Sequence, residues 1–75
     1  MTELVKYIAQ MIVNHPDKVS VTSRDVGRAI VIELHVDPED MGKVIGKQGR
    51  IAKAIRSVVK AATLKDKKKY IVEIR

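Results

Sequence analysis

The most constraining feature of the sequence is a turn with two glycines in the segment Val44–Arg50, Val-Ile-Gly-Lys-Gln-Gly-Arg. Gly46 stands where a helix ends, a position that favours a left-handed backbone, which glycine adopts without steric cost. Gly49 carries no side chain to keep another backbone away, and a longer helix begins just after it. The segment therefore predicts a short helix, a tight turn and a second helix.

The start of that second helix has the properties of an anion site. The first N–H groups of a helix have no partner inside it, and the helix dipole adds partial positive charge there. Lys47 and Arg50 contribute two full positive charges at the same place. A Gly-x-x-Gly turn also occurs as a plain corner between helices, so the turn alone is compatible with a purely structural role and with a functional one.

Length and charge narrow the class of protein. The chain has 75 residues, which predicts one domain over 1–75. Its 15 Lys and Arg against 9 Asp and Glu give a net charge of +6, which points to a polyanion such as nucleic acid. Two Tyr are the only aromatic residues, which argues against modules that stack bases on aromatic side chains. Cysteine is absent and no apolar run approaches the roughly 20 residues of a membrane span, so we expect a cytoplasmic protein without a membrane partner.

Hydrophobic spacing predicts six elements. Helices are expected over 3–14, from Asp37 to Ile45, and over 50–62, and strands over 18–23, 28–36 and 70–75. Thr2 is expected to cap the first helix. The side chains expected to face the core are Leu4, Val5, Ile8, Met11 and Ile12 in the first helix, Ile30, Ile32, Leu34 and Val36 in the second strand, and Ile51, Ile55, Val58 and Ala62 in the last helix.

The order of these elements predicts an α+β fold. The first two strands can pair as an antiparallel hairpin. The third strand follows two helices, so it can lie parallel to the second through a right-handed crossover. We therefore expect the order α-β-β-α-α-β, with a three-stranded mixed sheet and three helices packed on one face.

Catalytic chemistry has little support in the sequence. Asp37, Glu39 and Asp40 stand at the start of a helix, and capping its positive end explains these acids better than a catalytic carboxylate pair does. His15 is isolated at a turn, and no nucleophile and base can be assembled. We expect no enzyme, no catalytic residue, no metal and no cofactor.

The glycine turn between two helices, inside a strand–helix–helix–strand unit, resembles a KH domain. The extra helix and strand before that unit resemble the type II arrangement, and the likeness covers essentially the whole chain. The chain is most similar in kind to the small, free-standing bacterial KH proteins of the KhpA type.

The resemblance implies an RNA-binding protein whose Gly-x-x-Gly loop clamps the backbone of about four single-stranded nucleotides. The residues implied by position are Gly46, Lys47, Gln48 and Gly49 as the clamp, Arg50 beside it and Ile45 lining a groove. Lys43 and Lys53 are added because they lie close to the turn. Many KH domains have Ile or Val where this chain has Ala52, which predicts a shallower groove wall. The family also implies a global RNA chaperone or post-transcriptional regulator, and pairing as a homodimer or with a larger KH protein of the KhpB/Jag type.

The basic surface could also bind partners of two different classes. In the first alternative the chain is a protein-interaction or assembly module that pairs with another KH protein. In the second it binds duplex DNA as a helix–turn–helix. Ile51 and Ala52 at the start of the second helix offer little base-edge chemistry for the DNA alternative. Arg56 and Lys60 are expected on a solvated face. The segment Lys65–Lys69 is either a solvated loop or a second phosphate contact.

Overall fold

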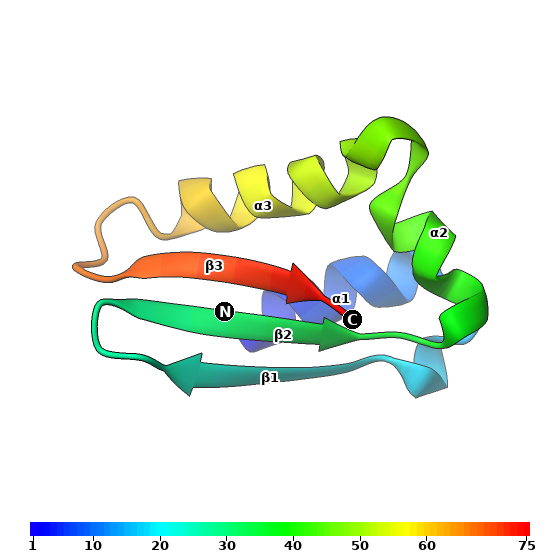
Figure 1. The fold of residues 1–75 in the computed structure, drawn as a ribbon, viewed down its shortest axis with the longest axis horizontal. Coiled ribbons are helices and arrows are strands. Elements are labelled where there is room, and N and C mark those ends of the chain that lie inside the picture. The colour runs from blue at the N-terminus through cyan, green and yellow to red at the C-terminus, as the bar shows by residue number, and fades with distance from the viewer.

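The computed structural model describes all of residues 1–75 and shows an α+β fold in two layers (Figure 1). The helices are α1 (Thr2–Ile12), α2 (Met41–Ile45) and α3 (Arg50–Ala62), and the strands are β1 (Ser20–Asp25), β2 (Ala29–His35) and β3 (Lys69–Ile74). Short 3-10 turns at Pro16–Lys18, Pro38–Asp40 and Lys47–Gly49 precede β1, α2 and α3. The predicted order of elements is confirmed. The helix expected from Asp37 is divided into a 3-10 turn and α2.

The central strand of the sheet is β2. It pairs antiparallel with β1, with Ser20 opposite His35, and parallel with β3, with Leu34 beside Ile74. Both the hairpin and the parallel crossover are as predicted. β1 and β3 are the edge strands of a mixed three-stranded sheet.

The helical layer covers one face of this sheet. α1 packs against β1 and α3 against β3, while α2 lies where the chain leaves β2 (Figure 1). The buried cluster between the layers consists of Val5, Ala9, Val13, Val19, Ile32, Leu34, Val36, Val44, Ile55, Val59 and Val72. The predicted α+β architecture with helices on one face is therefore confirmed.

The core-facing stripe of α3 differs from the predicted one. Ala52, Ile55 and Val59 are buried, whereas Val58 is 43% exposed and Ala62 is exposed. Apolar residues in α3 are frequent enough for two adjacent stripes to satisfy a helical period. Ile55 is buried as predicted and Ile51 packs partly buried against the core, but Val59 takes the place expected for Val58.

The first helix buries a narrower stripe than expected. Val5 and Ala9 are its buried residues, and Met11, expected in the core, is 70% exposed. Thr2 is the first helical residue instead of the cap, because Met1 takes the cap position without a side-chain hydrogen bond. α1 covers the edge strand β1, so its outer side has no partner within the domain.

A buried carboxylate joins the end of α1 to the start of α2. Asp40 is 1% exposed, and it accepts hydrogen bonds from the backbone N–H groups of Asn14 at 3.2 Å and His15 at 2.9 Å. The His15 Nδ1 atom lies 3.0 Å from the same carboxylate. Burial acts to raise the pKa of Asp40, but these hydrogen bonds outweigh it and hold that pKa below its usual value. The expected capping role is wrong for Asp40 and correct for Asp37, which accepts a hydrogen bond from the Glu39 N–H at 2.9 Å.

Candidate nucleic-acid interface

The turn between α2 and α3 has a backbone that requires glycine at both ends. Gly46 has φ +75° and its N–H donates to the Gly42 carbonyl at 2.8 Å, while Gly49 has φ +74° immediately before α3. A Cβ at Gly46 would overlap the Ile51 side chain, whereas a Cβ at Gly49 would meet open space. The left-handed backbone predicted at Gly46 is found at Gly49 instead, because Gly46 has a positive φ but an extended ψ of 173°. The close approach expected at Gly49 is found at Gly46 instead, and Gly49 is needed for its φ.

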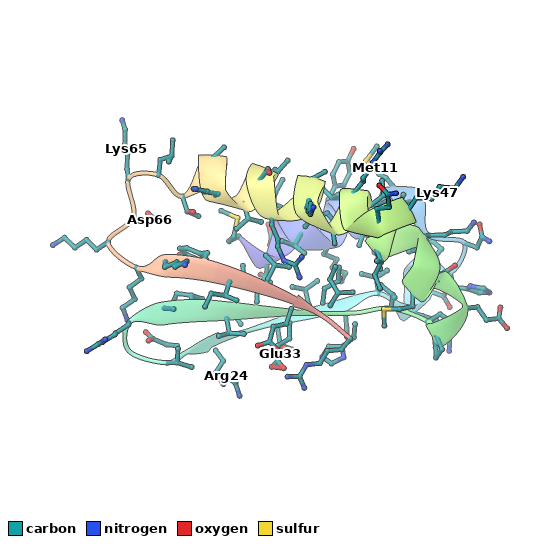
Figure 2. The ribbon with its side chains drawn as sticks, turned by 45° about the horizontal axis from the view of Figure 1, so that its top comes forward. Met11, Arg24, Glu33, Lys47, Lys65 and Asp66 are labelled. Carbon is teal, nitrogen blue, oxygen red and sulfur yellow. The ribbon has the colours of Figure 1, made fainter.

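The two residues between the glycines project from the molecule. Lys47 and Gln48 are exposed, and Figure 2 shows Lys47 directed into solvent at one end of the domain. Gln48 has φ +57° and is the one non-glycine residue with positive φ. That conformation costs a non-glycine residue on the order of 1 kcal/mol, which the surrounding structure must supply.

The start of α3 is left without an acidic partner. Its first turn has no side-chain cap and no acidic residue. Lys47, Arg50 and Lys53 are exposed around it. By contrast, the segment that leads into α2 is capped by Asp37. Because the positive end of the helix dipole and three cations meet at one exposed point, this end of α3 can receive an anion.

The flanking positions of the turn are divided between surface and core. Lys43 is exposed and Ile45 is 39% exposed on α2, beside the glycine turn. Ala52 is only 5% exposed and packs inward, so the expectation that it shapes an outer groove wall is wrong. The other predicted residues lie on the surface formed by α2, the turn and the start of α3.

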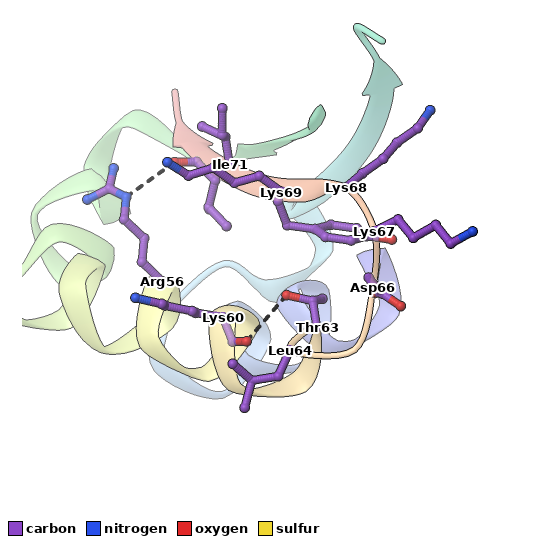
Figure 3. Close-up of a pocket in the computed structure, with 11 residues that line it drawn as sticks. Arg56, Lys60, Thr63, Leu64, Asp66, Lys67, Lys68, Lys69 and Ile71 are labelled. Carbon is purple, nitrogen blue, oxygen red and sulfur yellow. Dashed lines mark hydrogen bonds between the residues drawn. The ribbon is translucent and has the colours of Figure 1, made fainter. Parts of the chain in front are cut away.

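A hollow of about 660 Å³ lies between the second half of α3 and β3 (Figure 3). Arg56 and Lys60 are exposed, as expected, but their face of α3 is more than a plain solvated one, because both line the helical wall of this hollow. The Arg56 Nε atom donates to the Val72 carbonyl of β3 at 3.3 Å. Arg56 follows Lys53 by three residues and Lys60 follows Arg56 by four, and this spacing was the sequence signal for a shared stripe beside the buried one.

The loop from α3 to β3 closes one end of this hollow. Lys67, Lys68 and Lys69 line it, and Lys65 does not. The Lys68 Nζ atom lies 2.5 Å from the Asp25 carboxylate, which joins this loop to the turn between β1 and β2. The hydrogen bond from Lys68 lowers the pKa of Asp25, and the Gly27 N–H acts in the same direction.

One group of side chains combines ligand types that bind metals. One atom each from His15, Asp37 and Glu39 lie within 4.8 Å of one another. Asp37 already caps the following turn, and the Nδ1 atom of His15 contacts Asp40. Because these contacts within the protein already account for the positions of His15 and Asp37, we assign no metal to the group.

This fold and turn define a class of protein. A helix and a strand precede a strand–helix–helix–strand unit, and a Gly-x-x-Gly turn joins the two helices of that unit. This is the arrangement of a type II KH domain. The sequence profile described as KhpA/KhpB, KH domain, matches residues 2–74. The chain belongs to the KhpA/KhpB family of KH domains.

Curated relatives match over the whole chain. A protein of Caldanaerobacter subterraneus subsp. tengcongensis, named RNA-binding protein KhpA, is 64% identical over 74 residues, 99% of each chain. The proteins of the same name from Clostridium perfringens and Aquifex aeolicus are 60% and 45% identical; both matches cover 99% of this chain, and 99% and 94% of those proteins. RNA binding is not an enzymatic function, which agrees with the prediction of no enzyme. No solved structure gives a significant match. No helix in the structure has the length and apolar character needed to cross a membrane.

Proposed function

We propose that the chain binds single-stranded RNA and grips it through the turn Gly46–Gly49. The observation that carries this proposal is the exposed start of α3, which has no cap of its own and has Lys47 and Arg50 beside it. The names of the curated relatives support the choice of RNA as the polyanion. Lys43 and Lys53 add charge on either side of the turn.

The proposed grip works mainly on the RNA backbone. Gly49 has no side chain and a Cβ there would meet open space, so a phosphate can approach the chain closely at the positive end of α3. Lys47 and Arg50 neutralise the phosphates, and Gln48 adds a side-chain amide at the tip. Bases lie against aliphatic side chains such as Ile45, because the domain has only two aromatic residues. A single KH loop holds about four nucleotides in this way.

The test replaces the tip of the turn with acids. The double variant Lys47→Asp/Gln48→Asp should stay folded, because both side chains are exposed, and should lose binding to single-stranded RNA. The matched control is Lys18→Asp/Ser20→Asp, which makes the same charge change at exposed positions away from the turn. Binding is measured by fluorescence anisotropy and folding by circular dichroism. Native affinity in the folded turn variant would refute the grip.

We also propose that the protein acts on many RNAs, as an RNA chaperone or post-transcriptional regulator. Contacts with phosphates carry no sequence information, and aliphatic contacts with the bases do not read their hydrogen-bonding edges. Both properties support a broad set of RNA targets. Crosslinking in cells followed by sequencing of bound RNA tests this, with Lys47→Asp/Gln48→Asp as the control. A single enriched transcript would contradict a broad role.

Exposed apolar side chains favour a second role, pairing with another KH protein. Tyr7 and Met11 on α1 are 63% and 70% exposed, and Val58 on the adjacent α3 is 43% exposed. We propose that this face forms a homodimer, or a heterodimer with a KhpB/Jag-type protein. Sedimentation of native protein and of Val58→Lys tests the homodimer. Capture of a partner from nuclease-treated lysate tests the heterodimer. Equal sedimentation of both proteins as monomers, with no captured partner, would exclude pairing through this face.

A further inference from the structure

The turn Gly46–Gly49 follows α2, a helix too short to hold its own position. α2 has five residues, and an isolated helix much shorter than about 12 residues is not stable in water. Its last turn runs directly into the glycine turn, because the Gly46 N–H donates to the Gly42 carbonyl at 2.8 Å. The position of the glycine turn therefore depends on what holds α2 against the rest of the domain.

Two buried side chains hold α2 in place: Val44 within it and Asp40 just before it. Val44 is 0% exposed and belongs to the core cluster between the two layers. Asp40 immediately precedes the first residue of α2, yet its carboxylate does not cap that helix. It contacts the residues that follow α1, and Figure 1 shows the end of α1 beside the segment that leads into α2. Because apolar contact is not directional, the direction of α2 depends mainly on Asp40.

Both oxygens of the Asp40 carboxylate accept hydrogen bonds. Oδ1 accepts from the Asn14 N–H at 3.2 Å, and Oδ2 accepts from the His15 N–H at 2.9 Å. The His15 Nδ1 atom lies 3.0 Å from the same Oδ2. Asp40 is 1% exposed, so these donors replace the water that a carboxylate otherwise needs. Contacts from two adjacent residues therefore fix the carboxylate, and with it the start of α2.

We propose that Asp40 is a positioning residue for RNA binding, which sets the direction of α2 and thereby the place of the turn Gly46–Gly49. The inference rests on the proposed function and deepens it, because the grip then depends on a side chain that is buried away from the RNA. Five helical residues are about 8 Å long, so a tilt at Asp40 displaces the turn at the other end of α2. Without these hydrogen bonds the turn has the binding geometry for only part of the time.

The direction of the change in affinity is diagnostic, because Asp40 carries a negative charge. Asp40→Asn keeps the shape of the side chain but places an amide NH2 group where an oxygen accepts hydrogen bonds. Through charge alone, loss of an acid from a protein that binds a polyanion strengthens binding. Through positioning, the same change weakens it. The dissociation constant for a labelled oligouridylate of about four nucleotides should rise about three- to tenfold.

Two control variants separate positioning from charge and from stability. Glu39→Gln makes the same charge change at the neighbouring residue, which is exposed and forms no ion pair, and it should bind RNA at least as tightly as native protein. Val5→Ala truncates a fully buried side chain of α1 and keeps the donors around Asp40. It should lose stability and bind RNA normally. Binding is measured at a temperature where circular dichroism shows every variant to be fully folded.

Binding rates and salt dependence show how the affinity is lost. A turn that is competent for part of the time lowers the apparent affinity by the competent fraction. The association rate of Asp40→Asn should fall by that fraction, while its dissociation rate stays native. Its salt slope should also stay native, because the bound complex keeps the same phosphate contacts. Lys47→Asp/Gln48→Asp should instead accelerate dissociation and reduce the salt slope, because it removes contacts of the bound state.

A double-mutant cycle with His15 supplies a second test. His15→Ala removes the ring contact and keeps both backbone donors, so its loss of affinity should be smaller than that of Asp40→Asn. The loss should disappear in the Asp40→Asn background, whereas a direct contact between His15 and RNA would persist there. If Asp40→Asn does not fold, amide hydrogen exchange in His15→Ala decides. Exchange that accelerates more at 46–50 than in β2 supports the inference, and equal acceleration overturns it.

The outcomes also separate this inference from the grip itself. Native or tighter RNA binding by folded Asp40→Asn would overturn the positioning role. So would an equal loss of affinity in Val5→Ala, since the effect would then follow stability. Failure of the grip shows in a different variant: native binding by Lys47→Asp/Gln48→Asp would refute the grip, so the two failures are distinguishable.

Discussion

Gly46 and Gly49 are the same amino acid under two different constraints. Gly46 combines φ +75° with an Ile51 side chain that occupies the space of a Cβ, whereas Gly49 has φ +74° and open space. Gly42, in α2, has neither constraint. The three positions therefore separate the cost of a clash from the cost of a backbone conformation.

Alanine at these three positions should change the free energy of unfolding in a fixed order. Gly46→Ala should destabilise by about 3 kcal/mol, from strain and overpacking together. Gly49→Ala should destabilise by about 1 kcal/mol from φ alone. Gly42→Ala should stabilise by about 0.5 kcal/mol, because alanine favours a helix. Urea unfolding measures all three, and equal effects at Gly46 and Gly49 would disprove the role assigned to Ile51.

The contact between His15 and Asp40 should make stability depend on pH. The hydrogen bond to Asp40 raises the pKa of His15 above 6.5, against the opposing effect of burial. The protonated ring is therefore favoured in the folded state. Its contribution is fully present below pH 6.5 and is lost as the pH rises through the raised pKa of His15. At the acid end it is lost as the pH falls through the pKa of Asp40, which lies below 3.8.

A comparison of native protein with His15→Gln tests this pH dependence. The difference in the free energy of unfolding should be largest between about pH 4 and pH 6 and should shrink toward pH 8. Asp40→Asn supplies the control, because His15→Gln made in that background should have no such dependence. A difference that stays constant from about pH 5 to 8 would mean that the ring does not act through its charge.

At the scale of elements, α3 serves three surfaces at once. Ala52, Ile55 and Val59 face the core. Arg56 and Lys60 face the hollow beside β3. Val58 lies on the next side of the helix, which is apolar and exposed to solvent. The rotation of α3 on the sheet therefore decides which side chains are available to ligands.

Neighbouring valines in α3 test this rotation. Val59→Ala should destabilise by about 2 kcal/mol, because Val59 is 1% exposed and its loss leaves a cavity. Val58→Ala should change stability by less than about 0.5 kcal/mol, because Val58 is 43% exposed and alanine has the higher helix propensity. Thermal unfolding at one low protein concentration measures both. A larger loss at Val58 would support the stripe predicted from periodicity.

The elements and the glycine turn could be predicted because their signals are local. Alternation, helical spacing and the pair Gly46 and Gly49 are read within a few residues. The contact of Asp40 with His15 spans 25 residues and has no pattern in the sequence. The hollow likewise depends on α3 and β3 lying side by side, so Arg56 gave no local sign of its contact with Val72.

At the scale of the whole molecule, a small domain leaves much of its apolar surface uncovered. A chain of this size buries only about 60% of the surface that it exposes when unfolded. Tyr7 and Met11 show this on α1, and Val58 shows it on α3. Pairing through this face would add burial that one copy cannot supply, so association and stability should be linked.

This linkage predicts a melting temperature that rises with protein concentration. At a concentration about a hundredfold above the dissociation constant, pairing adds about 2.7 kcal/mol, which corresponds to a rise on the order of 10 °C for a domain this small. Val58→Lys should melt like native protein when both are dilute, because Val58 is partly exposed in the single copy, and should show no rise when concentrated. A melting temperature of the native protein that is independent of concentration would mean that each copy is stable alone and that the open face serves another partner.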